Sequence, residues 1–303
     1  MPASSIHPAR GFLVFFLAAL ASLGSSLLAD LVLQAFNTLP VPDHPEFFRL
    51  FFGSSLVLGP ALWYLVAESR YHGVRLLGLT LVVYIGAAQI MAHIETVVYN
   101  FLFQFTAGQI LFLVASQGLA ALLFVPLILT LAGKWKAPQV PVEDRVGEWL
   151  PQGGGFWMRL ALLSVLWYFT YMLAGYFIAD PITHRYYEAK MAGLSSINAW
   201  LPLVQLVRGL LWTLLFLLAV RLMNRPLGES GLVAGLLFGV FHAAGLLLPN
   251  ASMPDEMRLS HLPEIVLSLV WQGCLTVAVF RWRRPASRRD QKAEFEKTPA
   301  ELP

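Results

Sequence analysis

Long apolar runs, broken by short polar segments, dominate the pattern of hydrophobic and polar positions along this chain. Eight runs are near the roughly 20 residues that an α-helix needs to cross a bilayer. They cover residues 11–36, 50–67, 76–99, 106–131, 160–179, 201–220, 231–248 and 263–280. The runs are continuous rather than alternating, which favours helices over a β-barrel. We therefore predict an all-α integral membrane protein, a bundle of about eight transmembrane helices.

The basic residues between these runs predict an orientation. The segments after the second, fourth and sixth runs carry most of them, namely Arg70, Arg75, Lys134, Lys136, Arg145, Arg159, Arg221 and Arg225. Loops rich in Lys and Arg stay in the cytoplasm. Arg10 and the basic segment that begins at Arg281 then place both termini in the cytoplasm, which agrees with an even number of helices.

A segment rich in proline and glycine predicts how the chain divides. We expect a four-helix membrane half over residues 1–133, a cytoplasmic linker over 134–155, and a second four-helix half over 156–283. A charged cytoplasmic tail over 284–303 completes the chain. The halves show no convincing internal repeat, so an inverted-repeat transporter gains no support.

The composition agrees with a membrane protein and excludes several other classes. Of 303 residues, 57% are hydrophobic and only 13% are charged, and mean hydropathy is +0.64. Soluble domains carry about a quarter charged residues, so a cytosolic enzyme and a nucleic-acid binder are excluded. The single cysteine, Cys274, excludes a disulfide framework and a thiolate metal cluster.

Ionisable residues inside the apolar runs are the candidates for function, because such groups are costly in a bilayer. With the predicted orientation all of them fall in the outer half of the membrane, which predicts one polar cavity opening outward. They are Asp30, His93, Glu95, Arg208, His242, His261 and Glu264.

Helical spacing adds detail to this set. His261 and Glu264 are three residues apart and share a face, whereas His93 and Glu95 are two apart and point in different directions. Arg208 has no carboxylate three or four residues away in its own helix. Its partner must lie elsewhere, and Glu95, Glu264 and Asp30 are the candidates.

Two resemblances to known families follow from particular stretches. In LLFGVFHAAGLLLPN, Phe238 and His242 resemble the Phe-x-x-x-His motif of the CPBP intramembrane metalloproteases, the CAAX-processing type. Arg208 and His261 match further motif positions of that family, while Leu203 and Val204 stand where it has paired glutamates. The resemblance implies proteolysis through a metal and a glutamate-activated water.

The second resemblance covers roughly the second half of the chain. The stretches GYFIADPITHRYYEAK, LVRGLLWTLLFLLAVRLM and LLLPNASMPDEMRLSHLPEIVLS are similar to an uncharacterised family of bacterial polytopic membrane proteins. That resemblance implies a protein of the bacterial inner membrane and no particular activity.

Three hypotheses of function remain. In the first, His242, His261 and His93 hold a divalent metal such as Zn²⁺ in a membrane hydrolase, with Glu264 or Glu95 as general base and Arg208 stabilising an oxyanion. In the second, Arg208 pairs with an anion in a lipid- or solute-binding or transport protein. In the third, the chain is an accessory subunit whose polar groups lock helices together. Expected partners are membrane lipids and a lipid, peptide or small-molecule substrate, without nucleic acid.

Overall fold

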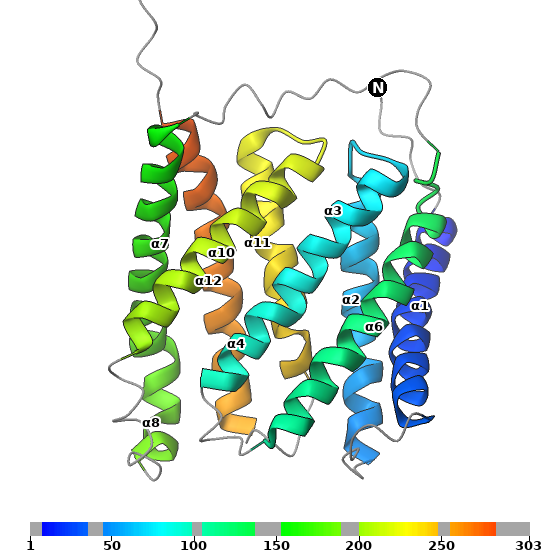
Figure 1. Cartoon of the computed structure of the whole chain (residues 1–303), viewed down its shortest axis with the longest axis horizontal. Coiled ribbons are helices and arrows are strands. Elements are labelled where there is room, and N and C mark those ends of the chain that lie inside the picture. The colour runs from blue at the N-terminus through cyan, green and yellow to red at the C-terminus, as the bar shows by residue number, and fades with distance from the viewer. Residues whose placement is uncertain are drawn as a thin grey trace, which may run out of the picture.

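The computed structural model describes residues 8–35, 45–98, 105–136, 153–188, 200–247 and 255–282, and within these ranges the chain is helical (Figure 1). The helices, in chain order, are α1 (Pro8–Ala35), α2 (Pro45–Ala67), α3 (Gly73–Ile85), η1 (Gly86–Ile90), α4 (Met91–Val98), α6 (Ala107–Leu131), α7 (Gly154–Ala174), η3 (Gly175–Ala179), α8 (Asp180–Glu188), α10 (Leu201–Leu222), α11 (Leu227–Ala243), η4 (Ala244–Leu246) and α12 (Asp255–Arg281).

The lengths and composition of these helices make the chain a multi-pass membrane protein. Seven described helical segments are long and apolar enough to cross a membrane, and Gly53–Ala67 is an apolar helical segment of shorter length. Large hydrophobic side chains such as Phe12 and Phe177 point outward, as a lipid-facing surface requires. An all-α membrane bundle is thereby confirmed, while the count of eight and the cytoplasmic termini stay predictions.

Several helices differ from their predicted limits, and for two of them the difference has a local cause. The run predicted over 76–99 forms α3 and α4 joined by η1, one turn of π-helix. The last run was expected to begin near Pro263, but α12 begins at Asp255 and continues through that proline. Proline removes only one backbone donor, so a helix that packs well on both sides of it can continue.

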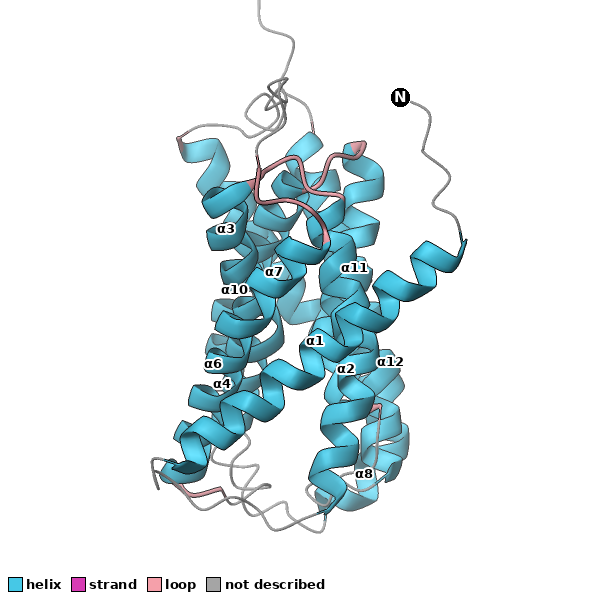
Figure 2. Cartoon of the chain, turned by 90° about the vertical axis from the view of Figure 1, so that its right-hand side faces the viewer, coloured by secondary structure: helices cyan, strands magenta, loops and turns pink. Residues whose placement is uncertain are grey.

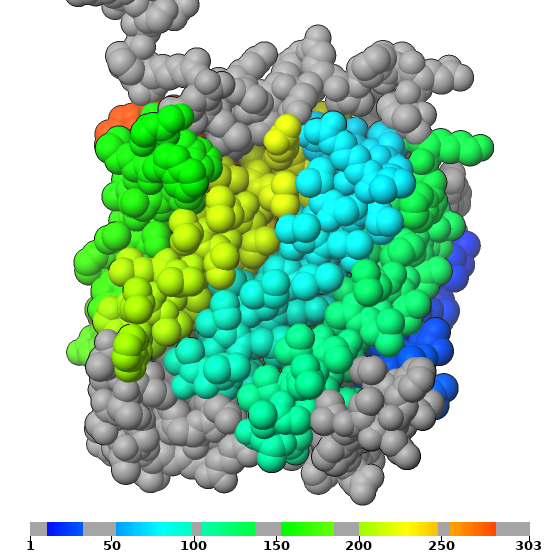
Figure 3. Space-filling view, in the orientation of Figure 1, coloured from blue at the N-terminus to red at the C-terminus, as the bar shows by residue number. Residues whose placement is uncertain are grey.

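The predicted halves pack directly against each other. Helix α3 lies beside α10 (Figure 3). Helix α11 contacts both α2 and η1. Turned by 90°, the molecule shows α1 crossing obliquely over α2 (Figure 2). Aromatic rings from both halves share one buried core, in which Tyr84 meets Phe241 edge to face with centroids 5.4 Å apart. The two predicted halves on either side of residue 133 therefore pack against each other without a gap between them.

Glycines bring α11 and α12 into close backbone contact. A Cβ built on Gly235 would lie 2.5 Å from the Cα of Val270, and one on Gly273 would collide with the carbonyl of Gly231. Small residues at such crossings let membrane helices approach closely. This crossing fixes the two helices that carry His242, His261 and Glu264.

Candidate functional site

Glu95 on α4 joins three helices. Its Oε1 lies 2.5 Å from Nη1 of Arg208 on α10, and its Oε2 lies 3.5 Å from Nε2 of His242 on α11. The sequence left Glu95, Glu264 and Asp30 as candidate partners of Arg208, and the structure selects Glu95. Asp30 instead accepts a hydrogen bond from Ser116, between α1 and α6.

Arg208 is almost fully buried, with 2% of its surface exposed. Its Nη1 donates to Oε1 of Gln205 over 3.1 Å, and the indole of Trp167 on α7 donates to the same oxygen over 3.2 Å. The Tyr171 ring lies 5.6 Å from the guanidinium carbon. Among the described residues, Nε of Arg208 has no acceptor. A buried guanidinium N–H without an acceptor is available to a negatively charged group.

The π-helical turn η1 orients His242. Met91 donates to the carbonyl of Gly86, five residues back, and the carbonyl of Ala87 lies 3.3 Å from Nδ1 of His242. A carbonyl can only accept, so Nδ1 is the donor in that contact, and the Glu95 carboxylate is a second acceptor on the other side of the ring. The other nitrogen, Nε2, then faces Glu95. The edge-to-face contact with Trp212, 5.4 Å between centroids, packs the ring from the side.

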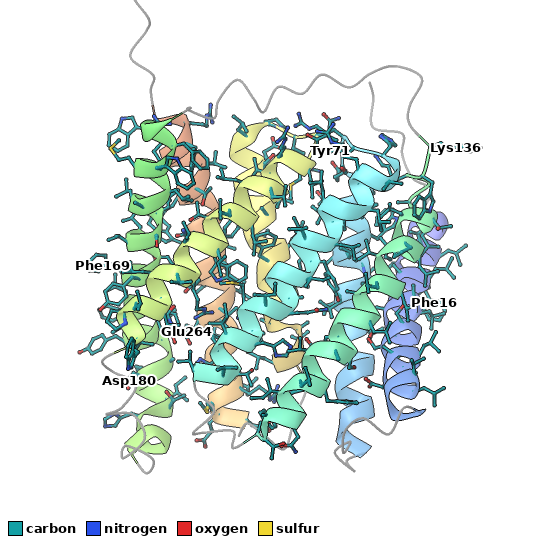
Figure 4. The ribbon with its side chains drawn as sticks, in the orientation of Figure 1. Phe16, Tyr71, Lys136, Phe169, Asp180 and Glu264 are labelled. Carbon is teal, nitrogen blue, oxygen red and sulfur yellow. The ribbon has the colours of Figure 1, made fainter. Side chains whose placement is uncertain are left out.

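His261 and Glu264 form the second acid–base pair. Nδ1 of His261 lies 2.5 Å from Oε2 of Glu264, so the prediction that they share a face of one helix is confirmed. The pair belongs to the same cluster, because His261 interacts electrostatically with Glu95. Glu264 lies in the half of the bundle away from Tyr71 and Lys136 (Figure 4). We call Glu95, Arg208, His242, His261 and Glu264 the polar cluster.

His93 does not join the polar cluster through any hydrogen bond or ion pair that the described residues make. It lies near Gln117 of α6, and both of its ring nitrogens are buried without a partner among those residues. The two-residue spacing from Glu95 explains this, because the side chains leave α4 in different directions. The metal-ligand set His242, His261 and His93 is therefore not assembled by these contacts.

The predicted metal site does not fit the side chains that the structure describes. Among them, no group of three or more His, Cys, Asp or Glu residues could hold a metal ion. The polar cluster instead pairs each histidine with a carboxylate and one carboxylate with an arginine. Such pairing is the pattern of an acid–base site, in which carboxylates orient imidazoles.

Two features of the site were not predicted from the sequence. Trp167 and Tyr171 are aromatic residues in an apolar run and were not among the candidate residues, yet they contact Gln205 and Arg208 from α7. The carbonyl of Ala87 is a backbone group, which the sequence cannot mark as functional, and only the flanking Gly86 suggests an irregular helix.

The chain matches no protein-family model, no curated protein and no solved structure.

Proposed function

We propose that this membrane protein is a hydrolase that works by acid–base catalysis at the polar cluster, without a metal step. The observation that supports it most is the 2.5 Å contact between His261 and Glu264, beside the Glu95–His242 pair and the buried Arg208. Hydrolases that activate a nucleophile with histidine use a carboxylate to orient the imidazole in this way.

The roles follow from the atoms that face one another. Glu264 orients the His261 imidazole through Nδ1, so His261 is the group that takes a proton from the attacking water. The water oxygen adds to the substrate carbonyl carbon, and the N–H on Nε of Arg208 stabilises the negative oxygen. When the bond to the leaving group breaks, His261 passes the proton that it took from the water to the leaving group, while Glu95 keeps Arg208 in place.

The surroundings favour a substrate that enters from the membrane. The cluster lies among membrane-spanning helices whose outer surfaces are apolar. An ester or amide of a lipid or of a membrane-inserted peptide can reach such a site without leaving the bilayer. We also propose, from the resemblances in the sequence, that the protein belongs to a bacterial inner membrane and that the cluster lies in its outer half.

The test is hydrolysis by the full chain in liposomes. A panel of fluorogenic ester, phospholipid and peptide substrates is compared for the wild type, Glu264→Gln and His261→Ala. We expect both variants to lose about a hundredfold or more in rate, as general acid–base groups contribute that much. His184→Ala is the matched control, because His184 is an exposed histidine on α8.

A second candidate function rests on Arg208 alone. In a binding or transport protein, a ligand anion could compete with the Glu95 carboxylate for Arg208. The Nε of Arg208, which has no acceptor among the described residues, would then give that anion a further donor. In that case Arg208→Lys abolishes ligand binding while His261→Ala leaves it intact. Loss of hydrolysis in both histidine and glutamate variants favours the enzyme. No hydrolysis by a folded wild type across the panel contradicts it.

A further inference from the structure

The end of the bundle opposite the polar cluster carries most of the positive charge of the described residues. Eight basic side chains lie there, against the acidic Glu68 and Glu229; they are Arg70, Arg75, Lys134, Lys136, Arg159, Arg221, Arg225 and Arg281. Tyr71 and Lys136 mark this end in Figure 4. We call it the basic end. It plays no part in the proposed hydrolysis.

Neutral backbone carbonyls hold several of these cations in place. Nζ of Lys134 donates to the carbonyl of Ser69 over 2.7 Å, and Nη2 of Arg70 donates to the carbonyl of Met223 over 2.6 Å. Carbonyls fix the side chains but cancel none of their charge. Arg225 is ion-paired with Glu68 and Glu229, but Lys134 and Arg70 are held by neutral carbonyls, so this part of the basic end is a preformed positive surface.

Arg75 and Lys136 both lie close in sequence to a contact between the start of α3 and the residues after α6. The backbone N–H of Gly73 donates to the carbonyl of Lys134 over 2.8 Å, which joins the start of α3 to the residues after α6. Arg75 and Lys136 each lie two residues beyond that contact, and both are exposed. The Arg75 guanidinium stacks over the Tyr71 ring at 4.3 Å, which orients it.

The local electrostatics favour a negative partner. Burial, together with the nearby charge of Lys134, lowers the pKa of His72, and burial lowers the pKa of Lys134. Lys134 therefore crowds His72, and an anion beside Lys134 lowers that cost, although Glu68 already offsets part of the Lys134 charge.

Apolar neighbours identify what kind of anion fits. Val74 is 78% exposed and Trp135 is 41% exposed, and both adjoin the cations. The Trp135 indole donates to the hydroxyl of Thr130 over 2.8 Å, which fixes the ring at the end of α6. A phosphodiester with acyl chains satisfies both kinds of surface, whereas free phosphate satisfies only the cations. We infer that Arg75, Lys134 and Lys136, with Trp135 and Val74, form a binding site for an anionic phospholipid.

Thermal unfolding of the purified full chain in detergent tests this site. Phosphatidylglycerol is added in steps, and the rise in Tm gives the apparent affinity. Removing two cations should weaken binding by about thirtyfold, so Arg75→Gln/Lys136→Gln should need that much more lipid. The matched control is Arg288→Gln/Lys292→Gln, which removes the same charge from the C-terminal segment.

Three further results decide the inference. The exchange Arg75→Lys/Lys136→Arg keeps both charges and should keep the affinity close to wild type. An equal loss in the C-terminal control overturns the site, because only net charge then matters. Equal stabilisation by phosphatidylcholine or by inorganic phosphate overturns the lipid assignment. Because this measurement uses no substrate, its failure is independent of any failure of the hydrolase.

Discussion

At the scale of single residues, Glu95 is the member of the polar cluster whose carboxylate faces two partners at once. It compensates Arg208, which is buried among apolar helices, and it faces His242 at the same time. Removing one partner of a buried ion pair leaves the other charge uncompensated, which costs more than the pair itself contributes.

Glu95→Gln should therefore destabilise the fold strongly. We expect a loss of about 3–5 kcal/mol in the free energy of unfolding, because Arg208 is left as an uncompensated buried charge. Reversible unfolding in mixed micelles measures it. Glu229→Gln is the control, since its pairing with Arg225 is exposed and is worth under about 1 kcal/mol. Similar effects of the two changes would refute the buried pair.

The sequence could predict part of this site at the residue scale. Residues three apart on a helix must share a face, so His261 and Glu264 were paired correctly. The choice of Glu95 as partner of Arg208 depends on how four helices pack, which residue spacing does not contain. His93 was grouped with the other histidines by membrane depth alone, and depth says nothing about the direction of a side chain.

At the scale of helices, the crossing of α11 and α12 determines how the cluster is held. Gly235 is packed against the backbone of Val270, which cannot move as the tip of a side chain can. Gly118 on α6 has open space around its Cα. The same substitution, glycine to alanine, can therefore be compared at a tightly packed position and at an open one.

Gly235→Ala should force α11 and α12 apart and destabilise the fold by about 1–3 kcal/mol, as overpacking does. Gly118→Ala should be neutral or stabilising by up to about 1 kcal/mol, since alanine is the better helix former. Thermal unfolding of both variants, with hydrolysis of the best substrate as second readout, makes the comparison. A harmless Gly235→Ala would mean that the crossing is not tight.

Helix existence was predictable at this scale, and helix irregularity was not. Long apolar runs leave few alternatives to helices in a bilayer, so every predicted run contains a described helix. The π-turns η1 and η3 depend on tertiary contacts that the apolar pattern does not record. The early start of α12 was missed because the residues before Pro263 are mostly polar, and the prediction followed the apolar run.

At the scale of the whole molecule, the two ends of the bundle differ in charge. The basic end carries eight cationic side chains, whereas described side chains at the other end include Asp180, Asp255 and Glu256. This asymmetry was visible in the sequence because loop charges need no knowledge of packing. It predicts an orientation that the arrangement of helices does not itself reveal.

A membrane-impermeant maleimide tests that orientation. In a Cys274→Ser background, Asp180→Cys should be labelled in intact cells, whereas Lys136→Cys should be labelled only after the membrane is opened. The two positions lie at opposite ends of the bundle (Figure 4). The reverse labelling would place the basic end outside and contradict the predicted topology.

The glycine crossing also limits how the molecule can move. Because the backbones of α11 and α12 are in contact, His242 and the His261–Glu264 pair lie on two helices that we expect to move as one rigid unit. Glu95 reaches that unit from α4, a helix of eight residues that follows a π-turn. We therefore expect a motion that admits a substrate to displace α4 relative to α11 and α12 and to break the Glu95–His242 contact.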